Sequence, residues 1–220
     1  MSKDTDYISP EYNPHSLQRD WGFLICEQHP EIIEAFSGSL SDLRARLHES
    51  SVGKFAQNDA NAPLTAGAPA KVTTDGLAAN RSSLYDEVGL DILTLALLSD
   101  VPAHRSLHLT QNSLIGHWRW LRDVWRYCAR HPQCDAPPHP HSTVTTALQS
   151  GKNNLAIAHL RDLFKKVQQA PNDAGLCISF LSSLSLFCPF IGTELLWRQG
   201  WIDHDPVSRS RTTGIRGTIE

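Results

Sequence analysis

The stretch from Leu114 to Cys128 carries the clearest helical periodicity in this sequence. Its apolar side chains recur at intervals of three and four residues: Leu114, Trp118, Leu121, Trp125 and Cys128. This spacing aligns side chains along one face of an α-helix. We therefore expect a helix through about Arg130 that buries Trp118 and Trp125 on the same face.

The segments on either side of this stretch also favour helices. Residues 141–147 and 155–167 predict a helical hairpin that turns near Gly151. A helix from Ser83 to about Ser99 is apolar over so much of its circumference that we expect it at the centre of the core. The fold class that follows is mainly α, an antiparallel helical bundle with an irregular N-terminal arm and a flexible C-terminal tail.

Composition divides the 220 residues into four segments. We expect an N-terminal arm with short helices (1–57), a loop or linker (58–82), a helical bundle core (83–204) and a polar tail (205–220). The linker is rich in Ala, Gly, Pro, Thr and Asn and shows no periodicity, which is typical of irregular structure.

Smaller expectations concern local structure. The short apolar run 21–26 suits either a strand or an extended arm. Short helices are predicted over 31–36 and 41–48, and a further helix after Pro102. The uncharged stretch 174–193 is long enough to span a membrane, but its four serines, Pro189 and Gly192 favour a buried helix instead.

Charge and motifs exclude several function classes. The formal net charge of −3 gives no basic footprint, so we expect no nucleic-acid partner. The five cysteines and the polar N-terminus without a signal peptide favour reduced thiols and a cytoplasmic location. No phosphate-binding glycine motif occurs, so no nucleotide or nicotinamide cofactor is expected.

Two groups of residues suit a divalent transition metal such as Zn, Fe, Ni or Mn. Asp100 and His104 are four residues apart and would share one face of a continuous helix; alternatively, Asp100 caps the helix after Pro102. The second group is dense in borderline and soft ligands: Cys128, His131, Cys134, His139 and His141. Its alternative interpretation is structural, because Cys128 also completes the apolar stripe.

A family resemblance rests on residues spread over about a third of the chain: Asp100, His104, Asn112, His141, Ala147, Gly151, Ala156 and Leu160. They resemble the FCD domain, the ligand-sensing domain of GntR-type bacterial regulators. The resemblance implies an antiparallel helical bundle whose metal site lies beside a pocket for small organic acids.

The same resemblance implies that Asp100, His104 and His141 are metal ligands. The family's fourth ligand position falls on Leu163, and the nearby histidine is His159, one turn earlier. The family's winged helix has no counterpart in residues 1–82, so the resemblance implies a stand-alone module and not a regulator. The hairpin around Gly151 is also similar to a single tetratricopeptide-type repeat, but no second copy of that period occurs.

The leading functional interpretation is a helical small-ligand-binding or metal-dependent protein, which includes a non-haem iron enzyme. Its metal ligands are Asp100, His104, His141 and His159. The alternative is a non-catalytic structural or interaction subunit, with a protein partner or a second copy of the chain on the Trp-rich helix. Whether the chain is an enzyme stays open at this level.

Overall fold

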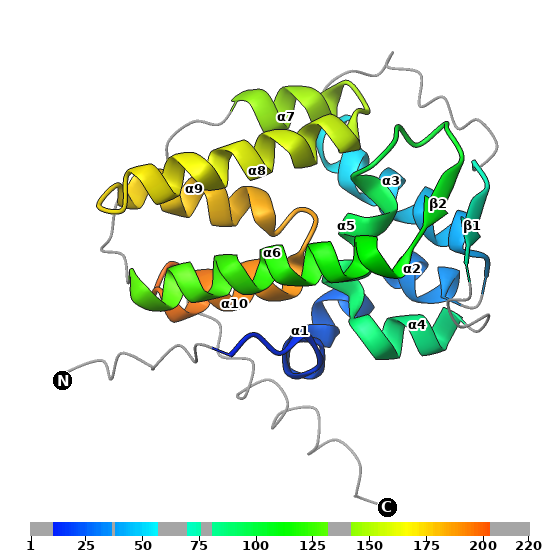
Figure 1. The fold of residues 1–220 in the computed structure, drawn as a ribbon, viewed down its shortest axis with the longest axis horizontal. Helices are drawn as coiled ribbons and strands as arrows, with labels where there is room; N and C mark the ends of the chain where they lie inside the picture. The colour runs from blue at the N-terminus through cyan, green and yellow to red at the C-terminus, as the bar shows by residue number, and fades with distance from the viewer. Residues whose placement is uncertain (1–10, 37, 57–69, 76–80, 132–141, 203–220) are drawn as a thin grey trace, which may run out of the picture.

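The apolar helix α5 (Leu90–Leu98) forms the centre of the molecule, and every one of its side chains is buried. The computed structural model describes residues 11–36, 38–56, 70–75, 81–131 and 142–202, and these form a mainly α structure (Figure 1). The predicted mainly α fold class is therefore confirmed. The predicted tail (205–220) and most of the predicted linker lie outside the described residues.

The other described helices are α1 (Pro14–Gln28), α2 (Pro30–Ala35), α3 (Leu40–Ala56), α4 (Arg81–Val88), α6 (Gln111–Arg130), α7 (Ser142–Gln149), α8 (Asn153–Gln169), α9 (Ala174–Leu184) and α10 (Pro189–Arg198). Of these, α3, α4, α6, α8 and α10 contact α5 directly, and the rest pack against them. Two short strands, β1 (Val72–Thr74) and β2 (Leu107–Leu109), pair in parallel at one side of the bundle (Figure 1).

The N-terminal region is more regular than the sequence suggested. The run 21–26 lies inside α1, so its interpretation as a strand or an extended arm is wrong. The Asn13 side chain accepts hydrogen bonds from the first backbone N–H groups of α1, and Pro14 suits the first turn. The buried indole of Trp21 donates to Glu194 Oε2 on α10 over 2.5 Å, which holds α1 against the bundle.

The single helix predicted from Ser83 to Ser99 is in fact two helices. Gly89, between α4 and α5, has φ = 82°, a left-handed conformation that favours glycine. A Cβ there would also lie 3.3 Å from the Pro14 side chain. The chain therefore breaks at Gly89 before the buried helix begins.

The helix predicted after Pro102 is absent from the described chain, which forms a loop and then β2. Val72 pairs with Leu107 and Thr74 with Leu109, so part of the predicted linker is a strand. The side chain of Thr110 then caps α6 by accepting a hydrogen bond from Ser113 N.

The C-terminal half agrees better with the sequence pattern. The helices α7 and α8 form the predicted hairpin, and Gly151 in the turn between them has φ = 66°. The uncharged stretch 174–193 is divided between α9 and α10. No helix in the described part of the chain is long and apolar enough to cross a membrane.

The apolar stripe of α6 is confirmed with one exception. Leu114, Leu121, Trp125 and Cys128 are buried, whereas Trp118 is only half-buried, so the prediction that both tryptophans are buried is wrong for Trp118. Trp118 lies at the edge of the stripe.

Candidate functional site

The two residues at the centre of the predicted metal site lie on a loop. Asp100 and His104 follow α5 and precede β2, and both are exposed. The prediction that they share the face of a helix is wrong, because the carbonyl oxygens of this loop bond to a buried side chain and not to a helical ladder. That side chain is Arg44.

The Arg44 guanidinium holds the loop through hydrogen bonds, and we name this group of bonds the Arg44 clamp. The guanidinium donates to the carbonyl oxygens of Leu97, Val101, Pro102 and Arg105 over 2.6–3.0 Å. Burial lowers the pKa of Arg44, although it leaves the group protonated. The Arg44 clamp supplies hydrogen bonds to carbonyl oxygens at the C-terminus of α5 that have no partner within the helix, and it fixes the path of the loop.

The remaining predicted ligands are dispersed. His159 lies half-buried on α8, and His141 lies outside the described residues. Among the residues that the structure describes, no three or more His, Cys, Asp or Glu side chains are grouped closely enough to hold a metal ion. Asp100, His104 and His159 are therefore not brought together, and the contribution of His141 stays a prediction.

The second predicted ligand group is divided in the same way. Cys128 is buried in the core beside Cys177. A hydrogen bond with Cys177 and the burial of the Cys128 thiol raise the pKa of Cys128. His131 stacks on Tyr127 with 4.4 Å between ring centroids. Cys134 and His139 lie outside the described residues, so the structure supports the structural interpretation only for Cys128.

A polar chain that the sequence did not reveal surrounds His117. This histidine is 4% exposed, and its Nδ1 lies 2.9 Å from Arg161 Nη2. Its Nε2 lies 3.2 Å from Ser99 Oγ, and Ser99 donates to Asp100 Oδ1 over 2.8 Å. Burial, and then the Arg161 charge, lower the pKa of His117 to about 4.

The direction of these bonds limits what the chain of groups can do. Arginine only donates, so Nδ1 of His117 accepts and the proton of the neutral ring lies on Nε2, towards Ser99. A serine nucleophile needs the opposite arrangement, in which the histidine nitrogen takes the serine proton. The group therefore links α5, α6 and α8, and in this state His117 does not activate Ser99 for attack.

The exposed side of α6 carries a row of basic side chains opposite its buried stripe. Arg119, Arg122, Arg126 and Arg130 follow one another at intervals of three and four residues. The row extends along about 16 Å of the helix at 1.5 Å per residue. In the described part of the chain, Arg119, Arg126 and Arg130 are exposed and have no carboxylate partner.

Aromatic rings lie beside the basic groups on both flanks of α6. The Arg122 guanidinium is 4.7 Å from the centroid of Trp118, and that of Arg161 is 5.2 Å from Trp120. On the α8 side, Trp120 packs edge-on against Phe164 and Phe180 of the core, at centroid distances of 6.2 and 6.5 Å. Stacking holds these two guanidinium groups near the surface while leaving their charges intact.

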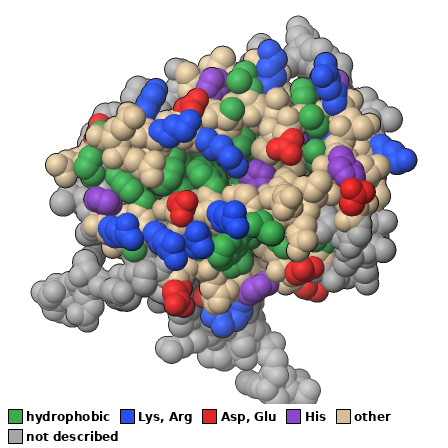
Figure 2. Space-filling model, in the orientation of Figure 1, with side chains coloured by type: hydrophobic (Ala, Val, Ile, Leu, Met, Phe, Trp, Pro, Cys, Tyr) green, Lys and Arg blue, Asp and Glu red, His purple; other side chains and the backbone are tan. Residues whose placement is uncertain are grey.

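Basic side chains also gather on α8, on the same face of the molecule. Figure 2 shows Lys and Arg side chains along both helices, with hydrophobic side chains between them. Together α6 and α8 contain seven Lys and Arg residues and two Asp residues. We name this surface the α6–α8 face and define it by its basic side chains: Arg119, Arg122, Arg126, Arg130, Arg161, Lys165 and Lys166.

The α6–α8 face was missed because the net charge of a whole chain averages over all of its surfaces. The chain outside α6 and α8 is strongly negative, so the net charge conceals the local excess of five positive charges on these two helices. The spacing of the arginines on the polar side of the α6 stripe was the available signal.

Comparisons with known proteins point to one class of enzyme. No family model matches this chain. The chain is similar to leucine–tRNA ligases from Azorhizobium caulinodans (29% identical over 110 residues, 47% of this chain), Paramagnetospirillum magneticum (26% over 159 residues, 64%) and Zymomonas mobilis subsp. mobilis (25% over 146 residues, 56%).

These matches cover only a small part of each ligase. They correspond to 13%, 18% and 17% of the respective ligases, so the chain spans less than a fifth of the relatives it matches. Helix α6 lies near the middle of the 220 residues. A continuous match to 64% of the chain therefore includes α6, whichever residue the match begins at. The similarity therefore extends to the helix that carries the arginine row.

Proposed function

We propose that this chain is a non-catalytic helical module that binds RNA of the tRNA class through the α6–α8 face. The observation that carries the proposal is the row of four arginines on the exposed side of α6. The similarity to three leucine–tRNA ligases supports tRNA as the partner, since tRNA is the polymer in the name of those enzymes.

The chemistry of the face suits a nucleic-acid backbone. Guanidinium groups bind phosphate oxygens through paired hydrogen bonds. In the described chain Arg119, Arg126 and Arg130 are exposed without a carboxylate partner, so they are available for such contacts. The half-buried Trp118 adds an aromatic surface on which an unstacked base can lie. The local positive charge, and not the net charge of the chain, governs attraction at this distance, because salt screens charges beyond about 8–10 Å.

A binding role is favoured over ligase activity by the extent of the match. The chain corresponds to at most 18% of a ligase, and the described residues around Ser99 and His117 are not arranged for nucleophilic chemistry. The proposal agrees with the non-catalytic alternative from the sequence and replaces its protein partner by an RNA.

The direct test is fluorescence anisotropy of a labelled leucine-specific tRNA transcript titrated with the full chain at 50 mM salt. We expect saturable binding that the unlabelled transcript reverses. A duplex DNA with the same number of phosphates should compete less well, because the two backbones differ in shape. An absence of binding at about 100 μM protein contradicts the proposal, because the dissociation constant would then be weaker than that of ordinary non-specific binding.

The metal-dependent function stays a prediction, since His141 lies outside the described residues. Elemental analysis of the purified protein tests it independently of RNA binding. A transition metal present at about one equivalent, and lost in His104→Ala, supports the predicted ligands.

A further inference from the structure

A threonine hydroxyl and a carboxylate lie on opposite sides of one histidine at the β1–β2 pair. His108 on β2 pairs with Thr73 on β1 in the register of the sheet, and Thr73 Oγ1 lies 2.9 Å from His108 Nδ1. Asp75 is two residues after Thr73, so an extended chain directs both side chains to the same face. Its Oδ2 lies 2.9 Å from His108 Nε2. We name Thr73, His108 and Asp75 the Thr73 triad.

The two ring nitrogens of His108 have different roles, because a carboxylate can only accept a hydrogen bond. Asp75 accepts from Nε2, so in the neutral ring Nε2 carries the proton and Nδ1 keeps its lone pair. Thr73 donates its hydroxyl proton to Nδ1, and this contact is shorter than the 3.4 Å from Thr73 Oγ1 to the carbonyl oxygen of Leu107. The imidazole is therefore placed to take the proton of Thr73, and the carboxylate to stabilise the imidazolium that forms.

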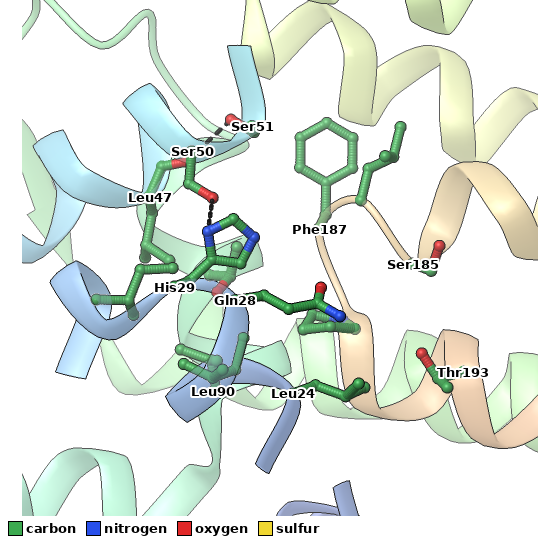
Figure 3. Close-up of a pocket in the computed structure, with 15 residues that line it drawn as sticks. Leu24, Gln28, His29, Leu47, Ser50, Ser51, Leu90, Ser185, Phe187 and Thr193 are labelled. Atoms are coloured by element: carbon green, nitrogen blue, oxygen red, sulfur yellow. Dashed lines mark hydrogen bonds between the residues drawn. The ribbon is translucent and has the colours of Figure 1, made fainter. Parts of the chain in front are cut away.

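Two other described histidines contact a serine hydroxyl, and neither is placed to take its proton. Glu31 Oε1 and Ser50 Oγ lie 3.0 and 3.2 Å from the same nitrogen of His29, Nδ1, which carries the proton that the carboxylate accepts. Figure 3 shows the bond between this ring and Ser50. At His117, the accepting nitrogen faces Arg161. The Thr73 triad differs because the hydroxyl and the carboxylate meet opposite nitrogens of one ring.

The Thr73 triad lies at the surface, where a reactant can reach it. The side chains of His108 and Asp75 are 48% and 84% exposed, and Thr73 is exposed as well. A hydroxyl activated in this way attacks an acyl carbon. An open surface supplies little binding energy to lower the barrier, so the acyl group must come from a donor with a good leaving group.

We propose that Thr73 is a nucleophile that accepts an acyl group from an activated ester or thioester, with His108 as general base and Asp75 as the residue that positions the ring. Thr73 Oγ1 forms a bond to the acyl carbon while His108 Nδ1 takes the hydroxyl proton. The bond from the acyl carbon to the leaving oxygen or sulfur then breaks, that atom keeps the electron pair, and His108 returns the proton to it. The products are an ester of Thr73 and a free alcohol or thiol.

The test treats the full chain with p-nitrophenyl acetate at about pH 8, where a histidine in water is neutral. Absorbance follows the release of p-nitrophenolate, and tandem mass spectrometry of the acid-quenched protein locates the acetyl group. Thr143, an exposed threonine on α7, is the control within the same sample. We expect Thr73 to be acetylated about 100-fold faster than Thr143, because general base catalysis commonly contributes about 10²–10⁴-fold.

Variants of the Thr73 triad assign the roles. Thr73→Val keeps the branched shape that suits a strand and should lose the acetylation, whereas Thr73→Ser should retain it. His108→Gln should slow the acetylation of Thr73 about 100-fold. Asp75→Asn should slow it by about tenfold or more, and Asp75→Glu, which keeps a carboxylate, should retain most of the parent rate. His15→Gln, an exposed histidine substitution on α1, is the matched control and should react as the parent does.

Urea unfolding checks that these exposed substitutions leave the fold intact. The proposal is overturned if Thr73 is acetylated no faster than Thr143, or if the parent chain and Thr73→Val release p-nitrophenolate at the same rate. It is equally overturned if Thr73 reacts at the same rate in His108→Gln and His15→Gln. The Thr73 triad contains no residue of the α6–α8 face, so these results are independent of RNA binding.

Discussion

Two buried titratable side chains give the stability of this protein opposite dependences on pH. Burial lowers the pKa of His117 to about 4, whereas burial raises the pKa of Asp91 to about 7 even though Asp91 accepts from the backbone N–H groups of Phe190 and Ile191. His117 therefore costs stability as the pH falls from about 6.5 to 4. Asp91 costs stability as the pH rises from about 4 to 7.

Substitution of either residue should reveal the contribution of the other. As the pH falls from 6.5 to 4, the unfolding free energy of His117→Gln should rise by up to about 3 kcal/mol relative to that of the parent. The reason is that the variant has no His117 imidazole to protonate. Asp91→Asn should lose unfolding free energy relative to the parent over the same range. Urea unfolding at several pH values measures both, and parallel curves for parent and His117→Gln would contradict the assignment.

The residue scale also shows where the sequence was least informative. Asp100 and His104 have a helical spacing, but Arg44, more than fifty residues away, binds the carbonyl oxygens of their loop. The partners of His117 come from α5 and α8. Long-range contacts of single side chains leave no periodicity in the sequence, so neither arrangement could be predicted.

At the scale of helices, Gly192 on α10 allows a close backbone approach. A Cβ at this position would lie 2.7 Å from the Cα of Ser185 in the turn after α9. Since backbone atoms cannot move aside as a flexible side chain does, only glycine allows this packing.

Gly192→Ala should therefore destabilise the protein by about 1–3 kcal/mol, as overpacking in a core does. Gly116 on α6 provides a matched control, because it is exposed and a Cβ there meets nothing within 4 Å. Gly116→Ala should be neutral or stabilise by up to about 1 kcal/mol through its helix propensity. Thermal or urea unfolding distinguishes the pair, and equal effects would disprove the close approach.

Two tryptophans of α6, Trp125 and Trp118, differ in burial and should differ in energetic cost. Trp125 is 4% exposed and packs on Tyr12, so Trp125→Ala should cost about 3–5 kcal/mol of unfolding free energy. The half-buried Trp118 should cost clearly less. Unfolding of both variants checks this order, and an equal cost would indicate that another surface covers Trp118.

Helices with a regular apolar stripe were predictable, and those defined by their neighbours were not. Helices α6, α7 and α8 follow from spacing and from Gly151. Helix α1 was missed because its apolar run is short, and it is stabilised by the Asn13 cap and by the Trp21–Glu194 bond. At Gly89 the chain takes φ = 82° and leaves no room for a Cβ beside Pro14, and the contact with Pro14 is one that no local pattern reveals.

For the whole molecule, the distribution of charge matters more than its sum. A chain of net charge −3 presents a face with seven basic and two acidic side chains on α6 and α8. The sum alone predicts no nucleic-acid partner. That expectation is untested by the fold, and the proposed function replaces it on the basis of the arginine row and the similarity to leucine–tRNA ligases.

The salt dependence of tRNA binding tests the proposed role of the α6–α8 face most directly. Arg119, Arg126 and Arg130 are exposed, so their combined change to glutamine should leave the unfolding free energy nearly unchanged. If each contacts a phosphate, the slope of log K against log salt concentration should decrease in magnitude by about 2–3. Arg46→Gln, an exposed substitution on α3, is the control and should keep the parent slope.

The measurement is fluorescence anisotropy of the labelled tRNA at several salt concentrations for the parent chain and both variants. We expect a shallower slope and at least tenfold weaker binding at 50 mM salt for Arg119→Gln/Arg126→Gln/Arg130→Gln alone. The same slope and affinity in all three proteins would contradict it.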